Sequence, residues 1–127
     1  MHRSQLAGLI IDCQTDNLEQ AAEFWSQALG YAIKPSTAPE DQNYAVFAVE
    51  PDQPYVEVQK VDHPSRVHLD IETDDIEAEV SRLEKLGAKR LRQVQNWWVM
   101  EAPTGHRFCV VPAYRSNFSQ QANLWDS

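Results

Sequence analysis

The sequence has few cysteines and no long apolar run. Its two cysteines, Cys13 and Cys109, lie far apart in 127 residues. A disulfide framework is therefore disfavoured, and reduced thiols are expected. No segment approaches the roughly 20 apolar residues of a membrane span, and the apolar run near the N-terminus is too short for a secretion signal. We expect a cytoplasmic protein without a membrane partner.

Basic residues are also scarce. The 11 Lys and Arg stand against 19 Asp and Glu, which gives a formal net charge of -8. Such a chain repels a phosphate backbone, so nucleic acid is disfavoured as a partner. The length suits one domain over residues 1–127, which would bury about two-thirds of the surface that the unfolded chain exposes.

An internal repeat organises the chain. LIIDCQTDNLEQ (residues 9–20) aligns with VHLDIETDDIEA (67–78), and Asp12 coincides with Asp70. Each copy is an apolar strand followed by an amphipathic helix that ends at a glycine, Gly30 or Gly87. We expect a capping box between Asp74 and Glu77. The buried helix faces are predicted to carry Leu18, Ala21, Ala22, Trp25 and Leu29 in the first copy, and Ile76, Val80, Leu83 and Leu86 in the second.

Short strand-like runs follow each helix, separated by turn signals such as residues 36–43 and 102–105. The expected strands are 31–34, 44–50 and 55–61 in the first half and 88–94, 97–101 and 107–111 in the second. The prediction is an α+β fold of two βαβββ modules, about 6–61 and 66–112, with a C-terminal tail at 113–127. The modules would form a curved mixed sheet around a cleft, with the helices on the outer face.

Strand alternation predicts which residues look into that cleft. In the second module Val67, Leu69 and Ile71 should face the helix, which leaves Arg66, His68 and Asp70 on the cleft side. In the first module the matching cleft positions are Gly8, Ile10 and Asp12. The two cleft faces are therefore chemically unlike.

These features resemble the vicinal-oxygen-chelate superfamily of glyoxalases, bleomycin-resistance proteins and dioxygenases, in particular its small glyoxalase-like domain group. The resemblance rests on AEFWSQALGY (22–31), RVHLDIETDDIEAEVSRLEKLGA (66–88) and WWVMEAPTGHRFCVV (97–111), and it extends over residues 6–112. It implies the two-module fold and a small-molecule ligand. Dimers are common in the superfamily, so the resemblance also implies a homodimer.

Metal-dependent members of the superfamily carry a His, Gln or Glu in the first strand of each module and a Glu in the last strand. In this sequence His68 occupies the position in the second module, but Ile10 stands at the first, and Cys109 replaces the final glutamate. We therefore expect no cofactor. If a divalent metal binds, its ligands would be His68 and Glu57, with Cys109 as a third candidate.

The site is predicted around His68 and Asp70 as catalytic residues. In this interpretation His68 acts as a general acid or base and Asp70 orients its ring. The alternative is that both residues are structural. Arg66, Trp97, Glu57 and Gln59 are the predicted ligand contacts. Trp97 is favoured over Trp98 for the cleft side. Asp12 and Asp70 are better explained as partners of backbone donors than as paired catalytic carboxylates.

Two further features are explained by structure without a role in catalysis. Cys109 has no base beside it in the sequence, so it is expected to be inert packing. The tail carries Phe118, Leu124 and Trp125, so it should dock either on its own chain or on a second copy.

Three functions compete: a glyoxalase-like small-molecule binder or enzyme without a complete metal site, a metal-dependent lyase, isomerase or dioxygenase, and a drug-sequestering protein. We favour the first, because Ile10 cannot ligate a metal and Arg66 is out of place in a site for cationic drugs. The sequence does not choose a substrate or a reaction.

Overall fold

The computed structural model describes residues 1–35 and 42–126. The chain forms two compact units, an N-terminal unit of residues 8–67 and a C-terminal unit of residues 1–7 and 68–127. The elements are β1 (His2–Gln14), α1 (Leu18–Leu29), β2 (Tyr44–Val46), β3 (Tyr55–Val61), β4 (Arg66–Thr73), α2 (Ile76–Lys85), β5 (Lys89–Val94), β6 (Trp97–Glu101), β7 (Arg107–Pro112), α3 (Phe118–Gln121) and β8 (Asn123–Trp125).

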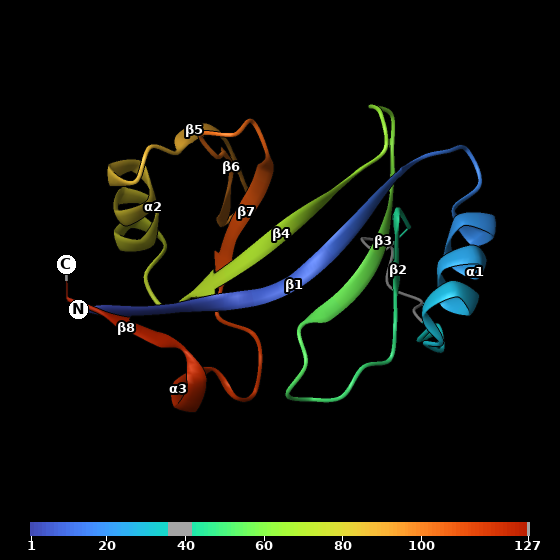
Figure 1. The fold of residues 1–127 in the computed structure, drawn as a ribbon, viewed down its shortest axis with the longest axis horizontal. Helices are drawn as coiled ribbons and strands as arrows, with labels where there is room; N and C mark the ends of the chain where they lie inside the picture. The colour runs from blue at the N-terminus through green and yellow to red at the C-terminus, as the bar shows by residue number, and fades with distance from the viewer. Residues whose placement is uncertain (36–41, 127) are drawn as a thin grey trace. The chain divides into compact units, whose positions relative to one another are not determined.

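In the N-terminal unit, β3 is the central strand. It pairs in parallel with β1 and antiparallel with β2, and α1 lies against β3 and β2 (Figure 1). Beneath α1, the buried residues Phe47, Val56 and Val58 form the core. Val56 and Val58 alternate with Glu57, so the helix covers one face of the sheet and the polar residues lie on the other.

The C-terminal unit repeats this connectivity with different residues. Its strand order is β4-β7-β6-β5, in which β7 pairs in parallel with β4 and antiparallel with β6. The helix α2 packs on β7 and β5 (Figure 1). The core beneath it consists of Val80, Leu83, Met100, Phe108 and Val110. Each unit is thus a helix on one face of a mixed sheet, and the predicted α+β fold with two βαβββ modules is confirmed.

The helix ends are set mainly by local side chains and glycines. Asn17 caps α1 by accepting a hydrogen bond from the Gln20 N–H at 3.0 Å. Gly30 ends α1 with φ at 78°, a left-handed conformation that glycine adopts without strain. Gly87 follows α2 with φ at 109°. Both predicted glycine ends are confirmed.

The predicted capping box of α2 is wrong, because the cap lies one residue later than expected and Ala78 stands where the box needs Glu or Gln. Asp75 is the cap, and its carboxylate accepts from the Ala78 N–H at 3.1 Å. Asp74 instead accepts from the Arg3 N–H at 2.8 Å, and Glu77 pairs with Arg90. The Asp74 carboxylate is hydrogen-bonded to the backbone of β1, and local sequence spacing does not reveal such a long-range partner.

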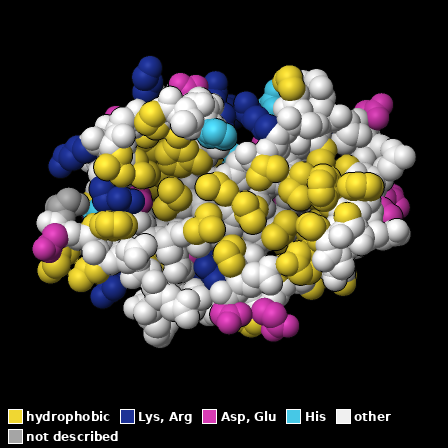
Figure 2. All heavy atoms as spheres, in the orientation of Figure 1, with side chains coloured by type: hydrophobic (Ala, Val, Ile, Leu, Met, Phe, Trp, Pro, Cys, Tyr) yellow, Lys and Arg dark blue, Asp and Glu magenta, His cyan; other side chains and the backbone are white. Residues whose placement is uncertain are grey.

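Four positions expected under the helices are exposed. Leu29 and Leu86 are 44% and 66% exposed, because each lies in the last turn of its helix or just beyond it. Val67 and Leu69, at the start of β4, are 52% and 42% exposed. Figure 2 shows that hydrophobic side chains reach the surface on the face it draws. The C-terminal end of each helix and the start of β4 therefore reach solvent.

The strands also depart from the predictions in the first half of the chain. Residues 31–34 make only an isolated bridge, between Ile33 and Phe47, and the expected strand 44–50 stops at Val46. Most of the predicted turn at 36–43, residues 36–41, lies outside the described residues. The strands predicted at 55–61 and 97–101 are confirmed at both ends.

The C-terminal tail docks on its own chain. β8 pairs antiparallel with the start of β1, and Phe118 is buried. The carboxylate of Glu72 accepts hydrogen bonds from the N–H groups of Tyr114 and Arg115, at 2.6 and 2.9 Å. Of the two docking alternatives, the structure therefore has the one within the chain.

A buried polar cluster joins both termini to α2. The Arg82 guanidinium donates twice to the Glu79 carboxylate at 2.8 Å, and His2 Nε2 lies 2.8 Å from the same group. Arg82 also stacks 3.9 Å from the Trp125 ring centroid, and Trp125 donates to Ser4. Burial alone would raise the pKa of Glu79, but the hydrogen bonds from Arg82, His2 and Ser4 hold it below its ordinary value.

Among the described residues, no helix has the length and apolar composition needed to cross a lipid bilayer.

Candidate functional site

The candidate site lies on β4, on the face of the C-terminal unit's sheet opposite α2. We call this the helix-free face. Leu69 and Ile71 pair with Phe108 and Val110, which belong to the core beneath α2. Because neighbouring side chains on a strand alternate, His68 points to the opposite face, together with Asp70. The predicted orientation of these two residues is confirmed.

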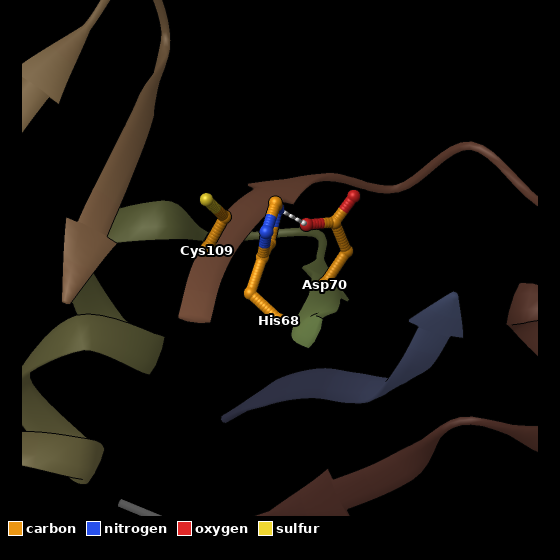
Figure 3. Close-up of side chains that lie close together, drawn as sticks. All are labelled: His68, Asp70 and Cys109. Atoms are coloured by element: carbon orange, nitrogen blue, oxygen red, sulfur yellow. Dashed lines mark ion pairs between the residues drawn. The ribbon is translucent and has the colours of Figure 1, made fainter. Parts of the chain in front are cut away.

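Strand pairing adds a third side chain to this pair. Asp70 and Cys109 are direct partners in the parallel β4–β7 pairing, so their side chains emerge on the same face. Three potential ligand atoms lie within 4.8 Å of one another: a nitrogen of His68, an oxygen of Asp70 and the sulfur of Cys109. Figure 3 shows the imidazole standing between the sulfur and the carboxylate. His68 and Cys109 are predicted from the sequence as candidate ligands of one metal, but the sequence does not place Asp70 with them.

The His68 and Asp70 side chains are largely shielded from solvent. The Nε2 atom of His68 lies 3.7 Å from Asp70 Oδ1, and the two side chains are 14% and 12% exposed. At this distance a protonated imidazole is attracted to the carboxylate, and low solvent access reduces the screening of that attraction. Cys109 is half-buried. The cluster can hold and move a proton next to a thiol.

Glu72 extends the same row and was missed by the sequence prediction. It is fully buried, accepts from the side-chain amide of Gln5 at 2.7 Å and holds the tail. Alternation from His68 through Asp70 reaches Glu72, so the parity argument could have found it. Its contacts make it a structural anchor of the tail.

Further charged groups share this face by register. Arg107 and Glu101 are paired residues of β7 and β6, with 3.5 Å between Arg107 Nη2 and Glu101 Oε2. On β5, Lys89 pairs with Glu101 and Arg92 pairs with Val99. Positive and negative side chains are therefore mixed across this part of the face.

The two tryptophans separate as predicted. Trp98 packs against the core beneath α2, and the Arg90 guanidinium lies 5.1 Å from its ring centroid. Trp97 is the preceding residue of β6, so its half-buried side chain points to the helix-free face.

Arg66 and Asp12 form a separate ion pair in the N-terminal unit. Arg66 Nε lies 3.9 Å from Asp12 Oδ2, and the Arg66 side chain is 44% exposed whereas that of Asp12 is buried. Arg66 Nη2 is also 3.4 Å from His63 Nε2. Asp12 and Asp70 therefore each lie near a cationic or titratable side chain. Their predicted role as partners of backbone donors stays a prediction.

The N-terminal unit has its own helix-free face, with different chemistry. Gly8, Ile10 and Asp12 pair with Tyr55, Glu57 and Gln59 across the β1–β3 ladder. The Tyr55 ring lies so close to Gly8 that a Cβ on Gly8 would come within 2.2 Å of it. Glu57 and Gln59 are half-buried. Their part in ligand binding stays a prediction.

His68, Asp70 and Cys109 supply an imidazole, a carboxylate and a thiol, and this group could hold a metal ion. The set differs from the predicted one, because Asp70 joins it and Glu57, which belongs to the other unit, does not. The position of Ile10 on the helix-free face of the N-terminal unit is confirmed, and its apolar side chain cannot ligate.

Solved structures share this fold at low sequence identity. Methylmalonyl-CoA epimerase from Mycobacterium tuberculosis matches with a TM-score of 0.60 and 17% identity, over 86% of this chain and 88% of that one. A methylmalonyl-CoA epimerase in complex with methylmalonyl-CoA and NH4+ gives 0.61 and 15%, over 89% and 97%. The Mn(II)-bound glyoxalase from Novosphingobium aromaticivorans gives 0.62 and 15%, over 91% and 41%.

Comparison of the sequence itself gives one family match. No curated protein matches the sequence. Residues 8–111, which include both βαβββ modules, match the family described as "Glyoxalase-like domain". This match and the shared fold confirm the resemblance to the vicinal-oxygen-chelate superfamily, and the chain belongs to the glyoxalase-like domain family.

Proposed function

We propose that this protein binds and transforms a small polar or anionic molecule on the helix-free face of its C-terminal unit. His68 is the acid–base residue, and Asp70 orients its ring. The observation that carries the proposal is the shielded His68–Asp70 pair, with 3.7 Å between Nε2 and Oδ1 and side chains only 14% and 12% exposed. A carboxylate beside a shielded imidazole holds the ring in one orientation, and a ring so held can act as a general acid or base.

The predicted ligand contacts fit this proposal to different degrees. Trp97 offers a half-buried aromatic surface on the same face and in the same unit as His68. Arg66 can hold an anionic group, although Asp12 at 3.9 Å already offsets part of its charge. Glu57 and Gln59 are polar groups on the helix-free face of the N-terminal unit. Trp97 is therefore the first of the four to substitute.

Thermal shift with a panel of small metabolites tests the proposal. A ligand that binds only the folded state raises the Tm, by an amount equivalent to about 2.7 kcal/mol when its concentration is 100 times Kd. We expect the shift to fall in His68→Ala and Trp97→Ala and to persist in His106→Ala, since His106 is exposed in a turn. A ligand shift unchanged in His68→Ala would contradict the proposed site.

A metal-dependent lyase or dioxygenase is the second candidate, favoured by the cluster of His68, Asp70 and Cys109. A bound divalent metal would act as a Lewis acid toward an oxygen of the substrate. The sulfur and imidazole donors suit zinc better than Mn(II). Elemental analysis of the purified protein should then find a stoichiometric metal that is lost in His68→Ala and in Cys109→Ser. Metal-free protein that still binds ligand would favour the first candidate.

We also propose that the protein is a homodimer, as the resemblance to the superfamily implies, and that it is cytoplasmic, as its two separated cysteines suggest. Because β8 is paired with β1 of its own chain, this dimer does not need the tail as a docking segment. Sedimentation velocity of the intact protein should give a dimer mass, and a monomer at all concentrations would remove the proposal.

A further inference from the structure

We infer that Cys109, His68 and Asp70 form a thiol–imidazole–carboxylate centre in which Cys109 takes an acyl group from a small activated ester or thioester. The inference rests on the proposed function in one respect, that the ligand lies over this cluster. It adds a covalent step through a residue that the sequence alone makes appear inert.

The structure supplies the base that the sequence around Cys109 lacks. Asp70 and Cys109 are Cα partners between β4 and β7, and His68 comes two residues before Asp70 on the same face. All three reactive atoms lie within 4.8 Å of one another, and the ring stands between the sulfur and the carboxylate (Figure 3). A thiol becomes an effective nucleophile when a neighbouring imidazole takes its proton, and a carboxylate beside the ring stabilises the imidazolium.

The other cysteine shows what an ordinary thiol in this protein looks like. Cys13 packs with the core beneath α1. Burial, with a smaller contribution from the Asp12 charge, raises the pKa of its thiol despite a hydrogen bond from Trp25. A raised pKa leaves less thiolate at neutral pH, so Cys13 should react slowly. The chain thus contains an internal control for Cys109.

The acyl transfer needs no oxidant, and its one co-reactant is water. The Cys109 sulfur attacks the carbonyl carbon as its proton passes to His68, and a carbon–sulfur bond forms. The bond from that carbon to the leaving oxygen or sulfur breaks, and the imidazolium returns the proton to the leaving group. Water then attacks the acyl-cysteine with His68 as base, which releases the carboxylic acid and restores the thiol. Asp70 acts throughout as a positioning residue.

The surrounding charges indicate that an uncharged probe is suitable. Arg107 lies two residues before Cys109 on β7 but is paired with Glu101 at 3.5 Å. Further charged groups on this face, by register, are Arg92 and Lys89 on β5 and the buried Glu72 on β4. Since cations and anions are both present, we do not expect a charged acyl group to be required.

The test uses p-nitrophenyl acetate with the full-length protein. We expect a burst of p-nitrophenolate close to one equivalent of protein, and peptide mass spectrometry should find the acetyl group on Cys109. Cys13→Ser should keep the burst, and Cys109→Ser should lose it. His68→Gln should slow acetylation by about 100-fold, the usual contribution of a general base. Asp70→Asn should slow it less and change its pH profile, which a merely structural role would not do.

Three results would overturn the inference. Acetylation of both cysteines at equal rates would remove the special reactivity of Cys109, and an unchanged rate in His68→Gln would remove the base. Protection of Cys109 until a chelator extracts a bound metal would assign the cluster to the metal-dependent candidate instead. Circular dichroism and melting of each variant show whether it is folded. Because Cys109→Ser can still be tested for the ligand-induced thermal shift, failure of acyl transfer is distinguishable from failure of the proposed function.

Discussion

The two units have the same connectivity but carry different side chains on their helix-free faces. In the N-terminal unit, Gly8 and Ile10 leave the first strand with little reactive chemistry before Asp12. In the C-terminal unit, the matching strand carries His68 and Asp70, and β7 adds Cys109. The residues under the helices are apolar in both units. The shared apolar faces therefore account for the common fold, and the two helix-free faces carry unlike side chains.

The largest expected effects come from the two cores. Phe47 in the N-terminal unit and Met100 in the C-terminal unit are 1% and 0% exposed. Truncation removes buried apolar contacts and leaves a cavity, so Phe47→Ala should cost about 3–5 kcal/mol of unfolding free energy and Met100→Ala about 2–5. Urea denaturation measures both. Phe24→Ala, at a position that is 63% exposed, is the control and should change stability by less than about 0.5 kcal/mol.

Hydrogen exchange on these core variants tests how independent the units are. Each variant should lose amide protection first in its own unit, because local opening follows the loss of local packing. Equal loss of protection in both units would show that they unfold as one. The two units would then be alike in connectivity without being independent in stability.

The cluster of Glu79 is a buried ion-pair network that belongs to the C-terminal unit. Its carboxylate is fully buried and pairs with Arg82 and His2. Glu79→Ala should cost about 3 kcal/mol, because it leaves a partly buried guanidinium without its partner. Glu77→Ala is a control on the same helix: Glu77 is 68% exposed beside Arg90, so its loss should cost less than about 1 kcal/mol. Equal costs measured by urea denaturation would refute the importance of burial here.

The sequence predicted these faces well where short-range pattern controls them. Alternation placed His68 and Asp70 opposite Ile71, and helical spacing placed Trp25 and Val80 in the cores. It could not place Cys109 beside Asp70, since that contact depends on the register between β4 and β7. Nor could it predict the partner of Asp74, because Arg3 lies 71 residues earlier in the chain. Long-range pairing therefore determines what local pattern leaves open.

A substitution at Gly8 tests how closely β1 and β3 pack on the helix-free face of the N-terminal unit. Its counterpart in the repeat is Arg66, but a side chain at position 8 meets the Tyr55 ring, 2.2 Å from an added Cβ. Gly8→Ala should therefore cost about 1–3 kcal/mol through overpacking. In a Tyr55→Ala background the same change should cost much less, and a double-mutant cycle measures the difference. A cycle without coupling would show that the ring moves aside freely.

Acid should weaken the C-terminal unit through Glu79. The hydrogen bonds hold the folded pKa of Glu79 below its ordinary value despite burial, so the folded state binds fewer protons than the unfolded state. The resulting stability is fully present above the unfolded pKa, roughly 4.3, and is lost as pH falls through the lower folded value. Urea unfolding between neutral pH and pH 3 should show a shallower acid slope in Glu79→Gln than in the wild type. Parallel slopes would exclude this contribution.

The smallest effects are expected at the two helix starts, where the units are most alike. Asn17 caps α1 through the Gln20 N–H at 3.0 Å, and Asp75 caps α2 through the Ala78 N–H at 3.1 Å. Replacing either by Ala should cost about 1 kcal/mol. Asp75→Ala should cost somewhat more at low salt, because its negative charge also interacts with the positive end of the helix dipole. Urea unfolding at low and high salt separates the two contributions. A salt-dependent cost for Asn17→Ala would contradict this assignment, since its amide carries no charge.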